Sequence, residues 1–157
     1  MMISEQKAGL RPNAWLLDFG QGFRAAVGTR VLLQIIHDPK LYQVPHTPRH
    51  CRSVLSWQGR LLPVMDMATC LGVKPETSTL VGIVGYKVKH GQLMNLGAIQ
   101  LSSVPNAIVA RDDQSCSLPE TQTGWGSLAI ACFAHQGEAV PIMHIERIFS
   151  SCTQHEC

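Results

Sequence analysis

Charged residues are scarce in this chain. Lys and Arg number 13 and Asp and Glu number 11, so 15% of the 157 residues are charged, where about 25% is usual. The formal net charge of +2 excludes the strongly basic surface that nucleic-acid binding requires. The hydrophobic fraction is an ordinary 45%, which excludes intrinsic disorder. This composition is typical of a globular protein with a weakly charged surface. Because the cores of protein interfaces are depleted in charge, it is equally consistent with a surface that other proteins partly cover.

Long apolar runs are also missing. No stretch approaches the roughly 20 apolar residues needed to cross a bilayer, and residues 1–13 (MMISEQKAGLRPN) lack the apolar core of a secretory signal. We therefore expect no direct membrane insertion and a cytoplasmic location. In that compartment cysteines are expected to be reduced thiols. The six cysteines, none of which forms a C-x-x-C pair, are Cys51, Cys70, Cys116, Cys132, Cys152 and Cys157.

The signature motifs of common enzymes are absent as well. The sequence contains no Walker loop, no G-x-S-x-G and no H-E-x-x-H. Asp66 and His144 would act as an acid–base pair only if the fold brought them within hydrogen-bond reach, and a helix-capping role is expected for Asp66. We predict that the protein is not an enzyme and uses no cofactor.

Two groups of residues have some character of a metal site. His46-Thr-Pro-Arg-His50 has zinc-like spacing, but its proline disfavours the helix that would align the two histidines, so we expect a solvated loop. The tail from Cys152 to Cys157 offers three soft ligands, whereas a structural zinc site needs four. We expect no metal, and a small ligand- or metal-binding β-barrel is the alternative function.

The chain contains an internal repeat. Gln58-Gly-Arg-Leu-Leu-Pro-Val-Met-Asp-Met-Ala-Thr-Cys-Leu71 recurs, without a gap, as Gln136-Gly-Glu-Ala-Val-Pro-Ile-Met-His-Ile-Glu-Arg-Ile-Phe149. Each copy predicts a hairpin turn at Gln-Gly, a return strand that contains proline, and one helical turn. A weaker echo pairs Gly22-x-x-x-x-Val27-Gly28 with Gly91-x-x-x-x-Leu96-Gly97. The sequence therefore predicts two related halves.

The remaining segments are short and rich in strand formers. They cover residues 14–19, 23–27, 31–36, 80–86, 93–96 and 107–110, and such spacing is typical of barrels and sandwiches. We predict a mainly-β fold with short helical turns, in which two small β-barrel subdomains related by internal duplication share an apolar seam. We expect residues 14–150 to form one domain of two lobes, with flexible segments at 1–13 and 151–157. The predicted core comprises Leu61, Val64, Met65, Leu71, Val140, Ile142 and Phe149.

One long motif resembles a known family. Val44-Pro-His-Thr-Pro-Arg-His-Cys-Arg-Ser-Val-Leu-Ser-Trp-Gln-Gly-Arg-Leu-Leu-Pro-Val-Met-Asp-Met67 is similar to the V-P-x-x-P, G-V-x-N-L-R-G and P-containing D-L pattern of the CheW family of bacterial chemotaxis adaptors. The similarity extends over about residues 15–150. It implies two small β-barrels around a shared core and no catalysis. It also implies a role coupling a chemoreceptor signalling domain to the regulatory domain of a histidine kinase, with recruitment to receptor arrays at the inner membrane.

The chain departs from the family pattern at charged positions. The family's Glu in V-x-E-I corresponds to Gln34, the Arg of its N-L-R-G corresponds to Gln58, and Asn95 replaces an Asp. In the family that Glu and Arg contribute to the surface that meets receptor and kinase, so we expect Gln34 and Gln58 to lie close together. An oligomerising scaffold that has lost kinase coupling is a further alternative.

The same motifs predict two partner-binding surfaces, residues 32–36 and 53–59. Trp57 is alternatively a core residue, and the two glutamines are alternatively solvated strand positions. The predicted partner-binding set is Leu32, Gln34, Ile35, Ser53, Ser56, Trp57, Gln58 and Gly59.

Overall fold

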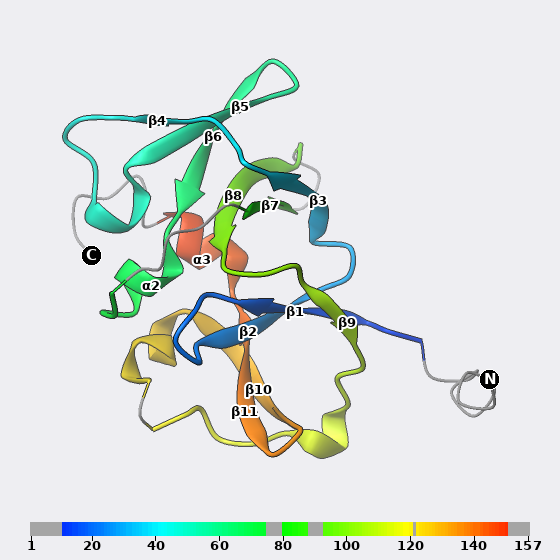
Figure 1. Ribbon diagram of the computed structural model, residues 1–157. Helices are drawn as coiled ribbons and strands as arrows, with labels where there is room; N and C mark the ends of the chain where they lie inside the picture. Colours follow the sequence, from blue (N-terminus) through cyan, green and yellow to red (C-terminus); the bar gives the residue numbers. More distant parts are fainter. Residues whose placement is uncertain (1–10, 75–79, 88–92, 121, 151–157) are drawn as a thin grey trace.

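The computed structural model describes residues 11–74, 80–87, 93–120 and 122–150, and in these ranges the chain forms two β-sheets and two short α-helices (Figure 1). One sheet has five strands in the order β10-β11-β2-β1-β9, and the other has six in the order β3-β7-β8-β6-β5-β4. The strands are β1 (Ala14–Asp18), β2 (Arg24–Gly28), β3 (Leu32–His37), β4 (Leu41–Gln43), β5 (Ser53–Trp57), β6 (Arg60–Met65), β7 (Leu80–Tyr86), β8 (Asn95–Leu101), β9 (Asn106–Ile108), β10 (Ala129–His135) and β11 (Glu138–Met143). The α-helices are α2 (Met67–Cys70) and α3 (Ile145–Ser150), and short 3-10 turns are η1 (Arg49–Cys51), η2 (Asp112–Gln114) and η3 (Thr123–Ser127).

The sequence repeat forms the same local structure twice, as predicted. Hairpins β5–β6 and β10–β11 each turn through a Gln-Gly pair, and both residues of each pair have positive φ, as a type I′ turn requires. Pro63 pairs with Val54, and Pro141 pairs with Cys132 at the equivalent register. A short helix follows each hairpin. The predicted duplication is therefore confirmed over both copies of the long motif.

The two halves exchange strands between the sheets. β1 and β2 from the first half lie in the five-stranded sheet beside β10–β11, whereas β7 and β8 from the second half lie in the six-stranded sheet beside β5–β6. The parallel contacts that join them are equivalent, since β6 pairs with β8 at Val64↔Ala98 and β11 pairs with β2 at Ile142↔Ala26. Each sheet therefore contains strands from both halves of the sequence.

These parallel pairs also correct the weaker sequence echo. Val64 and Ile142 are equivalent positions of the repeat, and they pair with Ala98 and Ala26, so Ala98 and Ala26 are equivalent too. This alignment is shifted by three residues from the one that matched Gly28 with Gly97. Gly91 lies outside the described residues. The glycine match was therefore out of register.

The predicted apolar seam between the sheets is the main core. Its fully buried side chains include Leu17 from β1, Met65 from β6, Ile99 from β8 and Ile148 from α3. Two smaller clusters lie within the individual sheets. The predicted mainly-β fold of two subdomains is confirmed. Among the described residues no pairing joins β9 to β10 or β3 to β4, so the hydrogen-bonded ladder is not continuous around either subdomain in these ranges.

The predicted core residues are mostly correct. Val64, Met65, Val140 and Phe149 are buried, whereas Leu71 and Ile142 are only half-buried. Leu61 is wrong, because 69% of it is exposed. Leu62 and Val64 point inward from β6, and strand alternation therefore turns Leu61 outward.

The expectations for Cys51 and for His50 need correction. Cys51 is disulfide-bonded, so the expectation of reduced thiols is wrong for this residue. Residues 1–10 and 151–157, and with them the tail cysteines Cys152 and Cys157, lie outside the described residues. His50, expected in a solvated loop, is fully buried in η1, while His46 is exposed.

Candidate partner-binding surface

The predicted partner-binding residues lie on two strands of the six-stranded sheet. Leu32, Gln34 and Ile35 lie on β3, and the others lie on β5 or in the turn that follows it. β7, β8 and β6 separate these two strands in the sheet. The sheet nevertheless curls far enough for the Trp57 indole Nε1 to donate a hydrogen bond to Gln34 Oε1 at 3.0 Å.

The side chain of Gln34 is bonded to Trp57, the residue that immediately precedes Gln58 in the chain. Gln58 and Gly59 form the exposed tip of the β5–β6 hairpin, where their positive φ angles of 50° and 78° set the turn. Trp57 is half-buried and also packs against the apolar cluster inside the six-stranded sheet. Trp57 therefore packs against the core with one part of its side chain and bonds to the exposed Gln34 through its indole nitrogen.

A β-bulge arranges the side chains of β3. The pairing of β3 with β7 shifts between Leu32↔Val84 and Gln34↔Ile83, which leaves Leu33 as the extra residue. Leu33 and Gln34 are consequently both exposed, while Ile35 and Ile36 are both half-buried. Bulges bend a strand and re-aim its side chains, and they are common beside functional sites.

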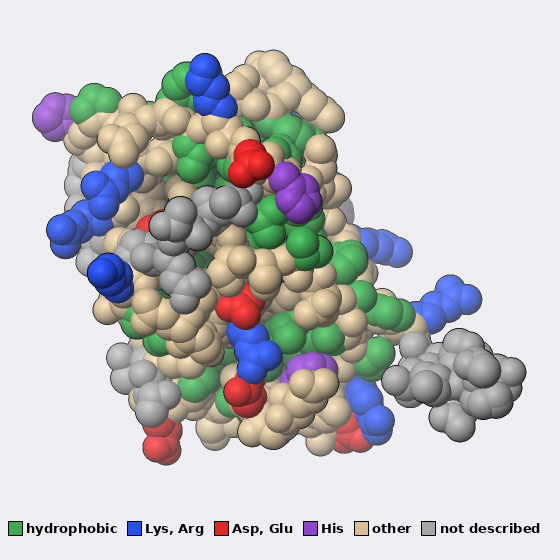
Figure 2. Space-filling model, viewed as in Figure 1, with side chains coloured by type: hydrophobic (Ala, Val, Ile, Leu, Met, Phe, Trp, Pro, Cys, Tyr) green, Lys and Arg blue, Asp and Glu red, His purple; other side chains and the backbone are tan. Residues whose placement is uncertain are grey.

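An uncharged hollow of about 220 Å³ lies beside this bulge. It is bounded by β3 of one sheet, by β1 of the other, and by the loop that precedes β9. Leu33 is 44% exposed and Val104 is 56% exposed. The hollow is lined by Trp15, Leu32, Leu33, Gln34, Ile35, Val104 and Pro105. Figure 2 shows hydrophobic side chains exposed at the level of β3 and β9, and charged side chains dispersed over this face.

Sequence reasoning found only part of this hollow. It selected the stretch 32–36, which includes four of the lining residues, but missed Trp15, Val104 and Pro105. One available signal was the run Leu32-Leu33-Gln34-Ile35-Ile36, which is apolar on both faces of a strand. A strand of that kind requires cover on both faces.

The predicted Ser53 and Ser56 do not line this hollow. Ser53 is half-buried and lines a second hollow of about 290 Å³ together with Leu61, Pro63 and Phe149. Ser56 is exposed. β5 therefore reaches the first hollow only through the bond from Trp57 to the lining residue Gln34, and it contributes Ser53 directly to the second hollow.

The polar residues that suggested other chemistry have structural roles. Asp66 caps α2, since Thr69 N donates to its Oδ1 at 3.2 Å and Thr69 Oγ1 donates to its Oδ2 at 2.7 Å. His144 is the equivalent residue of the second repeat, and its Nδ1 accepts from Arg147 N at 3.3 Å. The capping role predicted for Asp66 is confirmed. In the described ranges no three His, Cys, Asp or Glu side chains are grouped as metal ligands.

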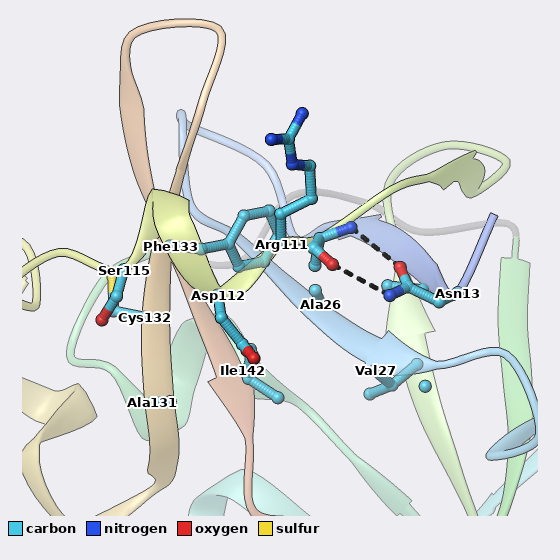
Figure 3. Close-up of a pocket in the computed structure, with 13 residues that line it drawn as sticks. Asn13, Ala26, Val27, Arg111, Asp112, Ser115, Ala131, Cys132, Phe133 and Ile142 are labelled. Atoms are coloured by element: carbon cyan, nitrogen blue, oxygen red, sulfur yellow. Dashed lines mark hydrogen bonds between the residues drawn. The ribbon is translucent and has the colours of Figure 1, made fainter. Parts of the chain in front are cut away.

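A further hollow of about 410 Å³ opens on the five-stranded sheet (Figure 3). Its wall is held by two reciprocal bonds: Asn13 Nδ2 donates to Ala110 O at 2.9 Å, and Ala110 N donates to Asn13 Oδ1 at 2.8 Å. Arg111 forms an ion pair with Asp113. These polar groups therefore stabilise the wall itself.

Comparison with known proteins gives a family for this arrangement. The fold is similar to the crystal structure of scaffolding protein TtCheW from Thermoanaerobacter tengcongensis, with a TM-score of 0.68 and 14% sequence identity over 84% of this chain and 88% of that chain. No curated protein sequence matches the chain significantly. None of the helices in the described part of the chain is long and apolar enough to span a membrane. The family model for the CheW-like domain matches residues 21–153, and the chain therefore belongs to the family of CheW-like domains.

Proposed function

We propose that this protein is a non-catalytic adaptor of a bacterial chemosensory complex, which couples a chemoreceptor signalling domain to the regulatory domain of a histidine kinase. The match of the CheW-like domain over residues 21–153 carries the proposal. Its proposed location is the cytoplasm, with recruitment to receptor arrays at the inner membrane.

The uncharged hollow beside β3 is the surface proposed to meet a partner. Leu33 and Val104 offer exposed apolar area at the junction of the two sheets. Pro105 also lines the hollow but is itself buried, and the lining includes no ionisable side chain. Burial of apolar surface contributes about 25 cal/mol per Å², and contact with such a hollow requires no charge to be desolvated. We therefore infer a partner segment that presents apolar side chains here.

The test measures binding of purified receptor signalling domain and kinase regulatory domain from the same organism. Leu33→Glu should weaken binding of one of them at least tenfold, because it places a carboxylate in an apolar contact. Ile130→Glu is the matched control: Ile130 is 66% exposed and also lies at a β-bulge, but on β10 at the far edge of the five-stranded sheet. Equal binding by the parent and both variants would refute this surface, and no binding of either domain would refute the adaptor role.

The two glutamines that replace the family's charges are tested in the same assay. Gln58→Arg should weaken partner binding, because a buried and unmatched charge costs roughly 2–5 kcal/mol. Gln34→Glu added to it should recover part of the loss if the two positions are close in the complex. Additive effects of the two substitutions would show that these positions do not interact.

Two alternative functions have distinct signatures. A small ligand- or metal-binding protein would retain its ligand through purification, which native mass spectrometry detects. An oligomerising scaffold without kinase coupling would form larger species by sedimentation and bind no kinase domain.

A further inference from the structure

Two thiols meet on the five-stranded sheet. Cys116 Sγ lies 3.5 Å from Cys132 Sγ. Cys132 is a β10 residue with 5% of its surface exposed, and Cys116 is half-buried in the segment that follows η2. The sequence placed Cys132 in an apolar stretch but gave no sign of this pair.

The backbone holds these two residues opposite each other. Ser115 forms an antiparallel bridge with Phe133, and Cys116 N donates to Cys132 O at 3.0 Å. In a hydrogen-bonded antiparallel pair the two Cα atoms lie about 5.5 Å apart, which is within the roughly 4.4–6.8 Å that disulfides span. The sulfurs need to approach by about 1.5 Å to reach the bonded distance of about 2.05 Å.

We propose that Cys116 and Cys132 are a redox modification site, at which the two thiols form a reversible intramolecular disulfide. The oxidant is a low-molecular-weight disulfide such as glutathione disulfide. The Cys116 thiolate attacks one sulfur of the oxidant, forms a mixed disulfide and releases one thiolate. Cys132 then loses its proton and attacks the Cys116 sulfur, which releases the second thiolate. Two protein thiols are oxidised, one small disulfide is reduced to two thiols, and both protons go to the released thiolates.

The environment of each thiol sets the order and the rate. Cys116 is the more exposed sulfur and reacts first with a soluble oxidant. Burial, together with the neighbouring Cys116 thiol, raises the pKa of Cys132 to about 12. Cys132 is therefore protonated at neutral pH, and the second step is slow and accelerates as the pH rises.

The disulfide would fasten one wall of the hollow in Figure 3. β10 is an edge strand, and the segment that bridges to it through Ser115 also carries Ala110, Arg111 and Asp112 of the hollow's lining. With both thiols reduced, this segment is joined to β10 by the backbone pairing at Ser115↔Phe133 and by the adjacent bond from Cys116 N to Cys132 O. A covalent link there would hold the segment against β10 and reduce its ability to separate.

The sequence provides a clean assay for this bond. No Lys or Arg lies between Arg111 and Arg147, so trypsin releases residues 112–147 as one peptide that contains both cysteines and no other. Full-length protein is equilibrated with glutathione disulfide, quenched in acid, alkylated in guanidinium and digested. We expect this peptide to be two hydrogens lighter and to carry no alkyl group, and to take up two alkyl groups after dithiothreitol treatment. A peptide with two alkylated cysteines, or with glutathione on Cys116 and an alkyl group on Cys132, would overturn the proposal.

Thermal unfolding supplies a second measurement. The loop closed between the two cysteines contains 15 residues (117–131), and a disulfide of that loop length should raise the melting midpoint by roughly 5–10 °C. Reduction also breaks the Cys51 disulfide. The contribution of the Cys116–Cys132 bond is therefore the part of the difference in melting midpoint between oxidised and reduced protein that is lost in Cys116→Ser. Cys70→Ser is the matched control and should keep the full shift. An equal shift in Cys116→Ser and in the parent would contradict the proposal.

Discussion

Replacing Gly97 by alanine should destabilise the protein by about 1–3 kcal/mol, the usual cost of overpacking a core. Gly97 is buried on β8, and a Cβ added there would lie 2.6 Å from Cζ and 2.9 Å from Cδ1 of Phe149. The ring is 2% exposed and stacks on Tyr86 with centroids 5.5 Å apart, so moving it away from the added Cβ would disrupt that stacking. The strain therefore falls on the contact between α3 and the six-stranded sheet.

Gly85 provides the matched control for this substitution. It is also buried, on the neighbouring strand β7, but its added Cβ would meet the sulfur and Cγ of Met94. Met94 is 40% exposed, and its flexible side chain can move toward solvent. Gly85→Ala should therefore cost less than about 1 kcal/mol, since the loss of glycine's unfolded-state entropy offsets part of any strain.

Urea unfolding followed by tryptophan fluorescence, to which the fully buried Trp125 contributes, measures both free energies of unfolding. Phe149→Leu removes the ring and should make Gly97→Ala less harmful. The loss of stability in the double variant should then be smaller, by at least about 1 kcal/mol, than the sum of the losses in the two single variants. A Gly97→Ala protein as stable as the parent would refute the reasoning. Strict additivity would show that the ring is not the obstacle.

Three other changes test the local structure by the same assay. Asp66→Ala should cost about 0.5–2 kcal/mol by removing the cap of α2 while Asp66→Asn costs almost nothing, and equal losses would contradict the capping role. Leu61→Ala should change stability by less than about 0.5 kcal/mol, whereas Leu62→Ala on the inward face should cost roughly 2–5 kcal/mol; similar values would mean that β6 is in another register. Burial lowers the pKa of His50 although Asp66 raises it in part, so the folded state takes up the proton less readily than the unfolded chain. The stability that comes from neutral His50 should be fully present above about pH 6.5 and be lost as the pH falls toward the folded-state pKa. If the free energy of unfolding of a His50→Gln protein fell equally steeply below about pH 6.5, His50 would be excluded as the cause.

Local features of the fold were predictable where one residue type determines one backbone state. The Gln-Gly pairs at 58–59 and 136–137 fixed both hairpins because glycine accepts positive φ at little cost. Strand β7 was predicted at 80–86 and lies at Leu80–Tyr86. The three-residue β4 was missed, because Leu41–Gln43 is too short to show a period.

Features that depend on distant parts of the chain were not predictable. Local pattern says nothing about which β-sheet a hairpin joins, so the exchange of β1–β2 and β7–β8 between the sheets was unforeseen. Alternation failed at Leu33, where one extra residue in β3 turns two successive side chains outward. The bond between Trp57 and Gln34 requires a curl of the whole six-stranded sheet, which no pair of residues encodes by itself.

The exchange of hairpins has a consequence for the order in which a growing chain can fold. β2 receives its parallel neighbour only from β11, and β6 receives its own only from β8. On the ribosome, the first half emerges with two hairpins that belong to different sheets and lack their partners. Such long-range pairing is slow because the closure of long loops must precede it. The two sheets therefore cannot be completed until β11 has left the exit tunnel, and the core between them only once α3 has followed.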